Sequence, residues 1–511
     1  MRQKWLWTLI HRRILISLLL VVQFAIIIYL VFSSSKNSMF INWGLKAISL
    51  LAALHIISKK EKGAYKLTWV FLILVFPVFG GLFYLLFNFQ ISTRKMSKIL
   101  SWIENESKPL FLMPGNIFEA ACNEAPEYIP QIQYLQNFAD FPIYSNTKTK
   151  YLSPGEEMFK HLIEELKKAE DYIFLEFFIV HEGIMWNTVL DILIEKAKKG
   201  VDVRLIYDDI GCFFLLPKDY PQRLEKLGIK CVVFNPFRPF LSTKQNNRDH
   251  RKIAVIDGKV AFTGGINLAD EYINAVEKYG HWKDAAIMVE GEGAWSFTLM
   301  FLQMWALCSG IEEDFTQYYP WKKEPCTIEK DGLVQPYADS PMDKENVGEH
   351  VYLLIINKAK KYIYINTPYL IIDDSMLSAL TLAAKSGVDV RIVTPYCWDK
   401  RIVHITTRSY YRDLIEAGVK IYEYSKGFIH SKTFVSDDKV ATVGTTNLDF
   451  RSLYLHFECG VWLYKSKAVM EVRDDFIETL EKCYQVTEED CKNNAIIRFI
   501  QEVFRLFAPL M

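Results

Sequence analysis

Long apolar runs dominate the first ninety residues of the chain and then stop. Residues 14–33 form an apolar run that one glutamine interrupts, and residues 67–89 form a second run of similar length. Each is long enough to cross a hydrocarbon layer of about 30 Å as a helix. Residues 40–57 are a weaker third candidate, because a lysine and a histidine interrupt them. The pattern predicts a membrane region within residues 1–92, with two or three transmembrane helices.

Basic residues flank these runs without fixing the orientation of the protein. Three spans with a cytoplasmic N-terminus agree with Arg12, Arg13 and the Lys-rich loop 59–66, and place the large C-terminal part outside. Basic residues just after the last run favour the opposite side. The first run also fits a signal peptide, but it is long for one and has no evident cleavage site, so we expect it to be retained. Residues 40–57 either cross the membrane or lie on its surface.

From about residue 130 onward, short apolar runs alternate with amphipathic stretches. Strands that alternate with helices indicate an α/β fold, in which helices cover both faces of a sheet. A G-V-D-V-R run occurs in both halves of this region and indicates a duplication. The pattern predicts strands at 172–180, 201–209, 362–370 and 388–396, and helices at 156–169, 187–199, 347–360 and 375–386.

Three further segments leave alternatives open. Residues 212–249 and 310–345 contain aromatic residues and prolines and are predicted to be loops, either walls that face a substrate or ordinary surface connections. The C-terminal stretch places five apolar residues on one helical face, so it either lies on a membrane surface or docks on the core. These residues are Ile496, Ile497, Ile500, Phe504 and Phe507.

The strongest local feature is a duplicated polar pattern in residues 250–272 and 430–452. Both copies read H-x-K-x4-D-x6-G-[GT]-x-N, and the copies lie 180 residues apart. Five positions at the same four spacings indicate an internal duplication. Residues two apart on a strand share a face, so the histidine and lysine of each copy are predicted to point the same way. The pattern residues are His250, Lys252, Asp257, Gly264 and Asn267 in the first copy, and His430, Lys432, Asp437, Gly444 and Asn447 in the second.

Two histidines, two lysines and two asparagines that converge would suit a phosphodiester. Lysine and asparagine bind non-bridging oxygens and stabilise charge in the transition state. One histidine can attack phosphorus while the other acts as acid and base, without a metal or another cofactor. Asp257 and Asp437 complete the candidate catalytic set, although their spacing favours bracing of the backbone or a lysine. Asp284 and Glu458 are candidates for orienting an imidazole, with surface acids as the plain alternative.

Composition narrows the class of protein. The 60 basic and 60 acidic side chains balance, which excludes a globally basic nucleic-acid binder. The nine cysteines are scattered without a C-x-x-C pair, so the chain predicts neither a zinc site nor a disulfide framework. Buried thiols of this kind favour a reducing compartment.

The duplicated pattern resembles that of the phospholipase D superfamily. HRKIAVIDGKVAFTGGINLADEY, GHWKDAAIMVEG, GFIHSKTFVSDD, TTNLDFRSLYLHFE and the apolar TWVFLILVFPVFGGLFYLLF are similar to bacterial cardiolipin synthases. The resemblance implies two tandem phospholipase D-like α-β-α sandwich domains, packed pseudo-symmetrically and preceded by transmembrane helices. We expect a linker at 93–130, domains at 131–310 and 346–511 with a C-terminal helix, and a connecting segment at 311–345.

The resemblance also implies an activity. A cardiolipin synthase transfers a phosphatidyl group from one phosphatidylglycerol to another and releases glycerol, as a multi-pass protein of the bacterial cell membrane. The family's usual assignment makes His250 the nucleophile and His430 the acid and base. A hydrolase or head-group exchange enzyme that uses water or another alcohol remains the alternative, and a catalytically silent scaffold is a third class. The chain departs from the family at Asp249, Lys283, Thr445 and His456, and in the additional run at 14–33.

Overall fold

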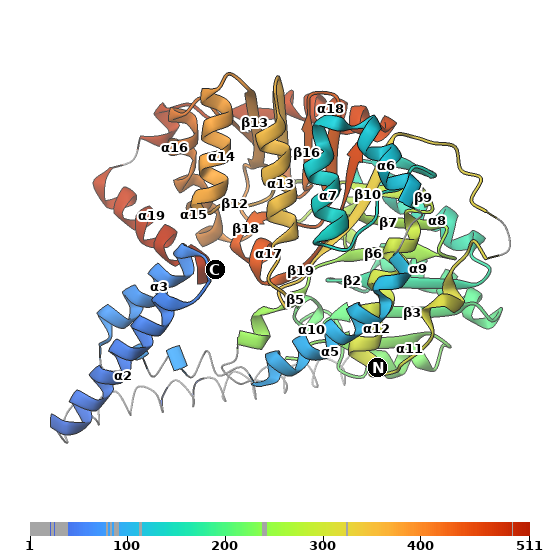
Figure 1. Cartoon of the computed structure of the whole chain (residues 1–511), viewed down its shortest axis with the longest axis horizontal. Helices are drawn as coiled ribbons and strands as arrows, with labels where there is room; N and C mark the ends of the chain where they lie inside the picture. The colour runs from blue at the N-terminus through green and yellow to red at the C-terminus, as the bar shows by residue number, and fades with distance from the viewer. Residues whose placement is uncertain are drawn as a thin grey trace.

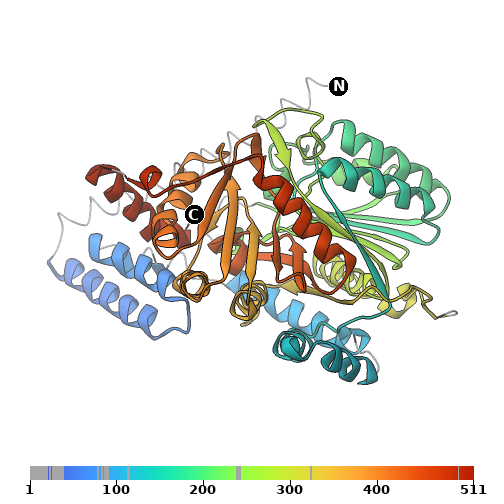
Figure 2. The same cartoon turned by 90° about the horizontal axis from the view of Figure 1, so that it is seen from above.

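Two β-sheets with closely similar strand order form the body of the molecule (Figures 1 and 2). The structure is a computed structural model that describes residues 39–510, apart from 78–79, 82–83, 86–90, 112–114, 238–242, 323–324 and 493, together with Val21 and Ala25.

The first sheet has seven strands in the order β1-β9-β7-β6-β2-β3-β4. The neighbours β2, β3 and β4 run parallel, and the other pairs are antiparallel. Side chains of β2 alternate between the two faces, so Phe174 and Leu175 enter different hydrophobic clusters. The strands are β1 (Thr147–Leu152), β2 (Tyr172–Phe177), β3 (Asp202–Asp208), β4 (Lys230–Phe234), β6 (Lys252–Ile256), β7 (Val260–Gly264) and β9 (Ala286–Gly291).

The second sheet repeats this order as β10-β19-β17-β16-β11-β13-β14 and adds β20 at one edge and β5 beside β19. Its parallel strands β11, β13 and β14 correspond to β2, β3 and β4. The predicted duplication is therefore confirmed by the topology. The strands are β5 (Arg248–Asp249), β10 (Leu333–Asp339), β11 (Tyr362–Asn366), β13 (Asp389–Pro395), β14 (Lys420–Tyr424), β16 (Thr433–Ser436), β17 (Val440–Gly444), β19 (His456–Tyr464) and β20 (Cys483–Gln485).

Helices cover both faces of each sheet, as the alternating pattern predicts. On the first sheet α8, α9 and α11 share one hydrophobic cluster, and α12 belongs to the other. On the second sheet α13 and α14 lie opposite α18 (Figure 2). These helices are α8 (Gly155–Lys168), α9 (Ile184–Lys198), α11 (Tyr220–Glu225), α12 (Ala294–Ser309), α13 (Val347–Lys358), α14 (Asp374–Lys385) and α18 (Lys467–Leu480).

Helix α12 joins the two halves into one core. Twelve of its sixteen residues are buried, as expected for a helix that is apolar all round. It contacts strands of the first sheet and also β10 of the second, while α18 contacts β1 of the first. Burial of this continuous core fixes the position of one half relative to the other.

Short strands are exchanged between the halves. Strand β5 comes after β4 in the sequence and so belongs to the first half. It nevertheless pairs in parallel with β19 of the second half. Strand β8 (His281–Lys283) pairs in parallel with β15 (Gly427–Ile429) in the same way. A further two-stranded sheet joins β12 (Leu370–Ile371) to β18 (Leu448–Asp449). The exchanged strands β5 and β15 directly precede His250 and His430, and the exchanged strand β8 directly precedes Asp284.

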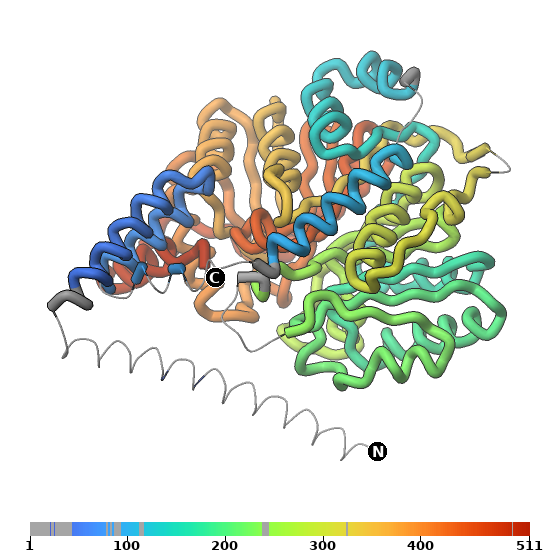
Figure 3. The backbone as a smooth tube through the Cα atoms, turned by 60° about the horizontal axis from the view of Figure 1, so that its bottom comes forward, coloured from blue at the N-terminus to red at the C-terminus, as the bar shows by residue number. Residues whose placement is uncertain are grey.

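The N-terminal helices form a hairpin that extends from the body, with the C-terminal helix beside it (Figures 1 and 3). Helix α2 (Met39–Ser58) packs on α3 (Gly63–Val75), and α19 (Ala495–Phe507) contacts both α3 and α15. Within the described part of the chain, none of the helices has both the length and the apolar character needed for a membrane crossing. The predicted run at 14–33 lies outside the described residues, apart from Val21 and Ala25.

The remaining helices surround these elements. They are α5 (Ile91–Ser107), α6 (Gly115–Glu124), α7 (Ile129–Asn137), α10 (Asp209–Cys212), α15 (Arg401–Ser409), α16 (Tyr411–Glu416) and α17 (Phe450–Tyr454), with 3-10 helices η1 (Lys108–Phe111), η2 (Pro126–Tyr128), η3 (Thr243–Asn246), η4 (Asp270–Ile273), η5 (Phe315–Tyr318), η6 (Glu489–Cys491) and η7 (Ala508–Leu510).

Some local predictions were wrong. The predicted loop 212–249 contains α11 and β4, because the chain needs this helix and strand to complete the parallel edge of the first sheet. The predicted strand 362–370 ends at Asn366 and resumes as β12. The stretch around Asp284 is two strands, β8 and β9, because β8 leaves the first sheet to pair with β15. The predicted C-terminal helix packs on α3 and α15 but keeps an exposed apolar side.

Candidate active site

Both duplicated histidines lie where strands of one half meet strands of the other. His250 follows β5, and its backbone N–H donates to the carbonyl of Phe457 at 2.9 Å. His430 follows β15, and its backbone N–H donates to the carbonyl of Lys283 at 2.7 Å. Their exposed fractions are only 8 % and 7 %. The exchanged strands therefore hold each histidine against the other half of the chain.

Each imidazole pairs with a carboxylate from the opposite half. Nδ1 of His250 lies 2.9 and 3.1 Å from the two oxygens of Glu458. Nδ1 of His430 lies 2.7 Å from Oδ2 of Asp284. The pairing is crossed, because His250 and Asp284 belong to the first half and His430 and Glu458 to the second.

These contacts select one tautomer of each ring. An ionised carboxylate only accepts hydrogen bonds, so facing one, Nδ1 carries the proton and Nε2 keeps a free lone pair. Nζ of Lys432 also lies 2.8 Å from Nδ1 of His430 and shares that nitrogen with Asp284. Burial lowers the pKa of His430 to about 4, helped by the charge of Lys432, and burial also lowers the pKa of His250. Both rings are therefore neutral at pH 7, and each presents a nucleophilic or basic nitrogen.

The two carboxylates differ in their surroundings. Burial works to raise the pKa of Asp284, but the charges of His430 and Lys432 outweigh it and lower the pKa. Burial raises the pKa of Glu458 well above its ordinary value, despite nearby Lys252. Thr445 donates to Glu458 Oε2 at 2.5 Å, and this hydroxyl orients the second carboxylate.

The two lysines lie beneath the histidines. Lys252 and Lys432 are 2 % and 1 % exposed, and the ammonium of each donates to the carbonyl of the histidine two residues before it. Burial lowers the pKa of Lys252 to about 8 and that of Lys432 to about 7. An anion between them would restore their charge, because a nearby negative group favours the ammonium form.

These pKa values predict a pH dependence. A free lysine loses its charge as pH rises through its pKa, so we expect kcat/KM for an anionic substrate to fall about tenfold per pH unit above pH 7. The measurement is kcat/KM between pH 6 and 9.5. In Lys432→Arg the charge persists, and the fall should move to higher pH even if turnover is lower. An unshifted profile in both Lys432→Arg and Lys252→Arg would contradict this assignment.

The conserved spacing places the remaining pattern residues at structural positions. Oδ1 of Asn267 accepts from the N–H of Ile179 at 2.9 Å, and its Nδ2 donates to the Tyr272 hydroxyl at 2.7 Å. Nδ2 of Asn447 donates weakly to Asp449 at 3.3 Å, and its buried Oδ1 has no partner in the part of the chain that the structure describes. Asn267 thus uses its amide to join loops, whereas Asn447 keeps an acceptor free.

Gly264 and Gly444 let adjacent strands approach closely. A Cβ at Gly264 would lie 2.4 Å from the carbonyl oxygen of Ala285, and one at Gly444 would lie 2.6 Å from that of Cys459. Gly264 also has φ of +151°, which side chains rarely adopt. These glycines let the strands pack closely, and a substrate-binding role for them stays a prediction.

Asp257 and Asp437 lie in turns away from the imidazoles and cap backbone amides. Asp257 accepts from the N–H groups of residues 170, 171 and 172 at 2.8–2.9 Å. Asp437 accepts from those of residues 360, 361 and 362 at 2.7–3.0 Å. In the structure these carboxylates brace the backbone, as their spacing favours, and a catalytic role for them stays a prediction.

Loss of this bracing should lower stability rather than chemistry. Asp257→Ala removes three charge-assisted hydrogen bonds, so we expect the free energy of unfolding to fall by about 2–4 kcal/mol. Turnover of the folded fraction should stay within about twofold. Urea unfolding and active-site-normalised rates measure the two effects, with Asp257→Asn as the milder matched variant. A tenfold loss of turnover in stable protein would return Asp257 to the catalytic set.

Several neighbours of the histidines were not predicted from the sequence. The rings of Phe178 and Tyr272 lie 5.0 and 5.7 Å from those of His250 and His430. Trp282, whose Nε1 donates to Asp284 at 3.5 Å, also packs beside His430. These aromatic residues carry no local pattern that separates them from core residues.

One group of side chains has the spacing of a metal site. Ligand atoms of His250, His456 and Glu458 all lie within 4.8 Å of one another. However, burial lowers the pKa of His456, and the positive charges of Arg451 and Lys252, which act on this group, lower it further. A cluster of cations favours a bound anion over a metal ion, so these residues fit a phosphodiester better.

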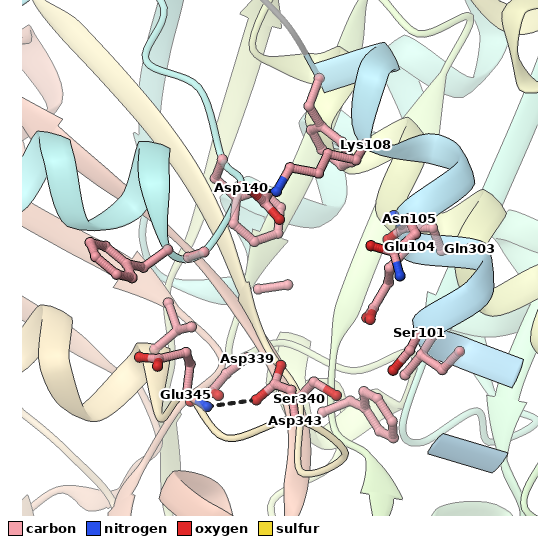
Figure 4. Close-up of a pocket in the computed structure, with 18 of the residues that line it drawn as sticks. Ser101, Glu104, Asn105, Lys108, Asp140, Gln303, Asp339, Ser340, Asp343 and Glu345 are labelled. Carbon is pink, nitrogen blue, oxygen red and sulfur yellow. Dashed lines mark hydrogen bonds and ion pairs between the residues drawn. The ribbon is translucent and has the colours of Figure 1, made fainter. Parts of the chain in front are cut away.

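A cavity of about 260 Å³ lies behind the catalytic strands (Figure 4). Arg251 and Phe457, the sequence neighbours of His250 and Glu458, contribute to its wall. Its other charged groups are mainly carboxylates, and burial raises the pKa of Glu104 to about 7 and that of Asp343 to about 6. The histidines and lysines of the duplicated pattern do not line this cavity, so it is separate from the candidate active site.

Comparisons with known proteins agree with this geometry. The family model "Cardiolipin synthase, PLD-like domain" matches residues 162–291 and 352–480, and "Phospholipase_D-nuclease N-terminal" matches residues 47–87. The crystal structure of phosphatidylserine synthase of Haemophilus influenzae Rd KW20 has a TM-score of 0.57 at 13 % identity, covering 74 % of this chain and 99 % of that chain. The latter likeness establishes a shared mixed α/β fold.

Sequence relatives extend over most of the chain. An uncharacterized protein of Streptococcus mutans serotype c is 44 % identical over 461 residues, which are 90 % of this chain and 99 % of that protein. A cardiolipin synthase of a Geobacillus species is 38 % identical over 460 residues, 89 % of this chain and 90 % of that protein. With its two matched domains and paired histidine sites, this chain belongs to the family of cardiolipin synthases built from duplicated phospholipase D-like domains.

Proposed function

We propose that this protein is a phosphatidyltransferase that converts two phosphatidylglycerol molecules into cardiolipin and glycerol. The observation that carries the proposal is the pair of neutral imidazoles, each oriented through Nδ1 by a carboxylate of the other half. Two buried lysines beside them supply the positive charge that a phosphodiester needs. The lipid substrate is inferred from the family to which the chain belongs.

The geometry supports a two-step reaction. In the first step, Nε2 of His250 attacks phosphorus, and His430 gives a proton to the departing glycerol oxygen. The bound phosphodiester favours the protonated form of His430, because a nearby negative charge raises the pKa of an imidazole. In the second step, His430 takes the proton of the acceptor hydroxyl, whose oxygen bonds to phosphorus as the bond to His250 breaks. The assignment of His250 as the nucleophile and His430 as the acid and base follows from the family resemblance.

Product analysis tests the proposed acceptor. Purified protein in detergent–phosphatidylglycerol micelles should form cardiolipin and glycerol in equal amounts. Formation of phosphatidic acid as the main product would instead identify a hydrolase that uses water. Product formation that survives loss of both imidazoles would contradict the site itself.

We also place the protein at the bacterial cell membrane, with its N-terminal segment as a multi-pass anchor. The hairpin of α2 and α3 and the adjacent α19 support this location, because they expose large apolar side chains beside one another. In cell membranes washed with alkaline carbonate, the protein should remain in the membrane pellet. Release into the supernatant would contradict the anchor. Exposed side chains on these helices include Trp43, Leu50, Leu54, Leu67, Leu74, Ile496 and Phe499.

A further inference from the structure

The two half-sites differ in the residue that lies two positions before each supporting acid. In the first half this residue is Trp282, whose ring lies 5.2 Å from that of His430. In the second half it is His456, whose ring lies 5.5 Å from that of His250. The His430 side of the site is therefore lined by an apolar indole, and the His250 side by a polar imidazole.

A charge difference accompanies this exchange. Four residues after the asparagine of the duplicated pattern, the first copy has Glu271 and the second has Arg451. Nε of Arg451 donates to Nε2 of His456 at 3.4 Å. A cationic side chain thus reaches the imidazole on the His250 side, and the other copy has an acid at the matching position.

Arg451 is half-buried, and its guanidinium has few partners in the described part of the chain. Among the described residues its guanidinium makes no ion pair, and burial lowers its pKa. The carboxylate of Asp449 is the nearest source of negative charge, but it already accepts from the N–H of Ser452 at 2.8 Å and from Asn447 at 3.3 Å. A guanidinium has five N–H donors, so most of those of Arg451 remain available to an anion.

Tyr65 brings a second free donor from the N-terminal hairpin. Among the described residues its buried hydroxyl has no hydrogen-bond partner, and the charge of Arg451 acts on it. Its ring packs edge-on against Phe450 and Tyr454, at 5.8 and 6.2 Å between ring centroids. Both rings belong to α17, the helix that carries Arg451.

An ion pair holds the hairpin in this position. The ammonium of Lys62 lies 2.6 Å from Glu349 and 3.2 Å from Asp373, both in the second half of the chain. Because Glu349 is fully buried, this contact fixes the start of α3. Tyr65 therefore faces α17 as part of the folded site.

We propose that Arg451, His456 and Tyr65 form a second anion site, which holds the phosphate of the acceptor phosphatidylglycerol. This inference rests on the proposed function. Six covalent bonds of about 1.5 Å separate the two phosphorus atoms of cardiolipin, so the acceptor phosphate lies within about 7 Å of the transferred one. That reach covers His456, whose ring lies 5.5 Å from that of His250, when His250 carries the phosphatidyl group.

The site would favour a lipid acceptor over water. In the second step, the acceptor hydroxyl loses its proton to an imidazole, its oxygen bonds to phosphorus, and the nitrogen–phosphorus bond breaks. Arg451 and Tyr65 bind the acceptor's own phosphate and hold this hydroxyl near the covalent intermediate. Water and ethanol carry no phosphate, so they gain nothing from the second site.

The test measures how the covalent phosphatidyl-enzyme intermediate is partitioned among competing acceptors. Full-length protein is given phosphatidylglycerol micelles with ethanol, and cardiolipin, phosphatidylethanol and phosphatidic acid are quantified. The ratio of these products does not depend on how fast the intermediate forms. In Arg451→Met we expect the ratio of cardiolipin to the other two products to fall about 10- to 100-fold. Tyr65→Phe removes only a hydroxyl and should lower the same ratio about three- to tenfold.

Controls separate this inference from the proposed function. Arg412→Gln changes an exposed arginine on α16 that already pairs with Glu416, so its product ratio should equal that of the wild type. If the wild type makes no cardiolipin, the proposed function fails. If it makes cardiolipin and the ratio is unchanged in both Arg451→Met and Tyr65→Phe, or all products fall together, only the second site is overturned.

A free phosphate ion is the other source of the same chemistry. Inorganic phosphate at millimolar concentration should compete with acceptor phosphatidylglycerol in the wild type and lose this effect in Arg451→Met. Phosphate inhibition that depends on Arg451, without any change of product ratio in the variant, would identify a site for free phosphate and overturn the lipid assignment.

Discussion

Replacement of either His250 or His430 by asparagine should lower cardiolipin formation by at least about 10³-fold. Each imidazole supplies an atom that forms or breaks a bond in the proposed reaction, and asparagine has no group that can replace it. Steady-state assays on phosphatidylglycerol micelles measure this loss. His161→Asn, on α8, is the matched control and should retain wild-type turnover.

A donor with a nitrophenol head group separates the two roles. This leaving group departs without a proton, so His430→Asn should still release one equivalent of nitrophenol and accumulate a phosphatidyl-enzyme. His250→Asn should release none. A burst in His250→Asn together with label on His430 would reverse the roles, and turnover by either variant at the wild-type rate would end the proposed mechanism.

Loss of a supporting carboxylate should have the next largest effect. We expect Glu458→Gln and Asp284→Asn each to lower turnover by about 10²- to 10⁴-fold, in the range known for acids that orient a catalytic histidine. An amide can donate to Nδ1 and so stabilise the opposite tautomer, which places a proton on the reactive Nε2. Glu423→Gln, a buried glutamate of β14, is the control and should retain activity.

The crossed arrangement adds a prediction that activity alone does not test. Nitrogen NMR of the histidine rings should show that Glu458→Gln changes the tautomer of His250 and leaves His430 unchanged. Asp284→Asn should do the reverse, because its carboxylate lies 2.7 Å from His430. Changes confined to the histidine of the same half would contradict the crossed pairs.

The local sequence pattern was sufficient to predict most of the secondary structure and the identity of the reactive groups. The strand and helix periods around β2, β3, α8 and α9 depend on residues close in sequence, so they were predicted to within a few residues. Periodicity does not show that β8, just before Asp284, leaves the first sheet to pair with the distant strand β15. Such a pairing depends on the whole packed chain and leaves no local mark.

The sequence by itself determined the duplication and the identity of both His–Lys pairs, because each follows from residue type and spacing, and it offered Asp284 and Glu458 as candidate supporting acids. Only the tertiary structure decided that Glu458 serves His250 and Asp284 serves His430. It also moved the aspartates of the pattern into backbone caps. The physical reason is that buried α12 and the exchanged strands fix the two halves against each other, and contacts across that interface join residues about 150 to 200 positions apart.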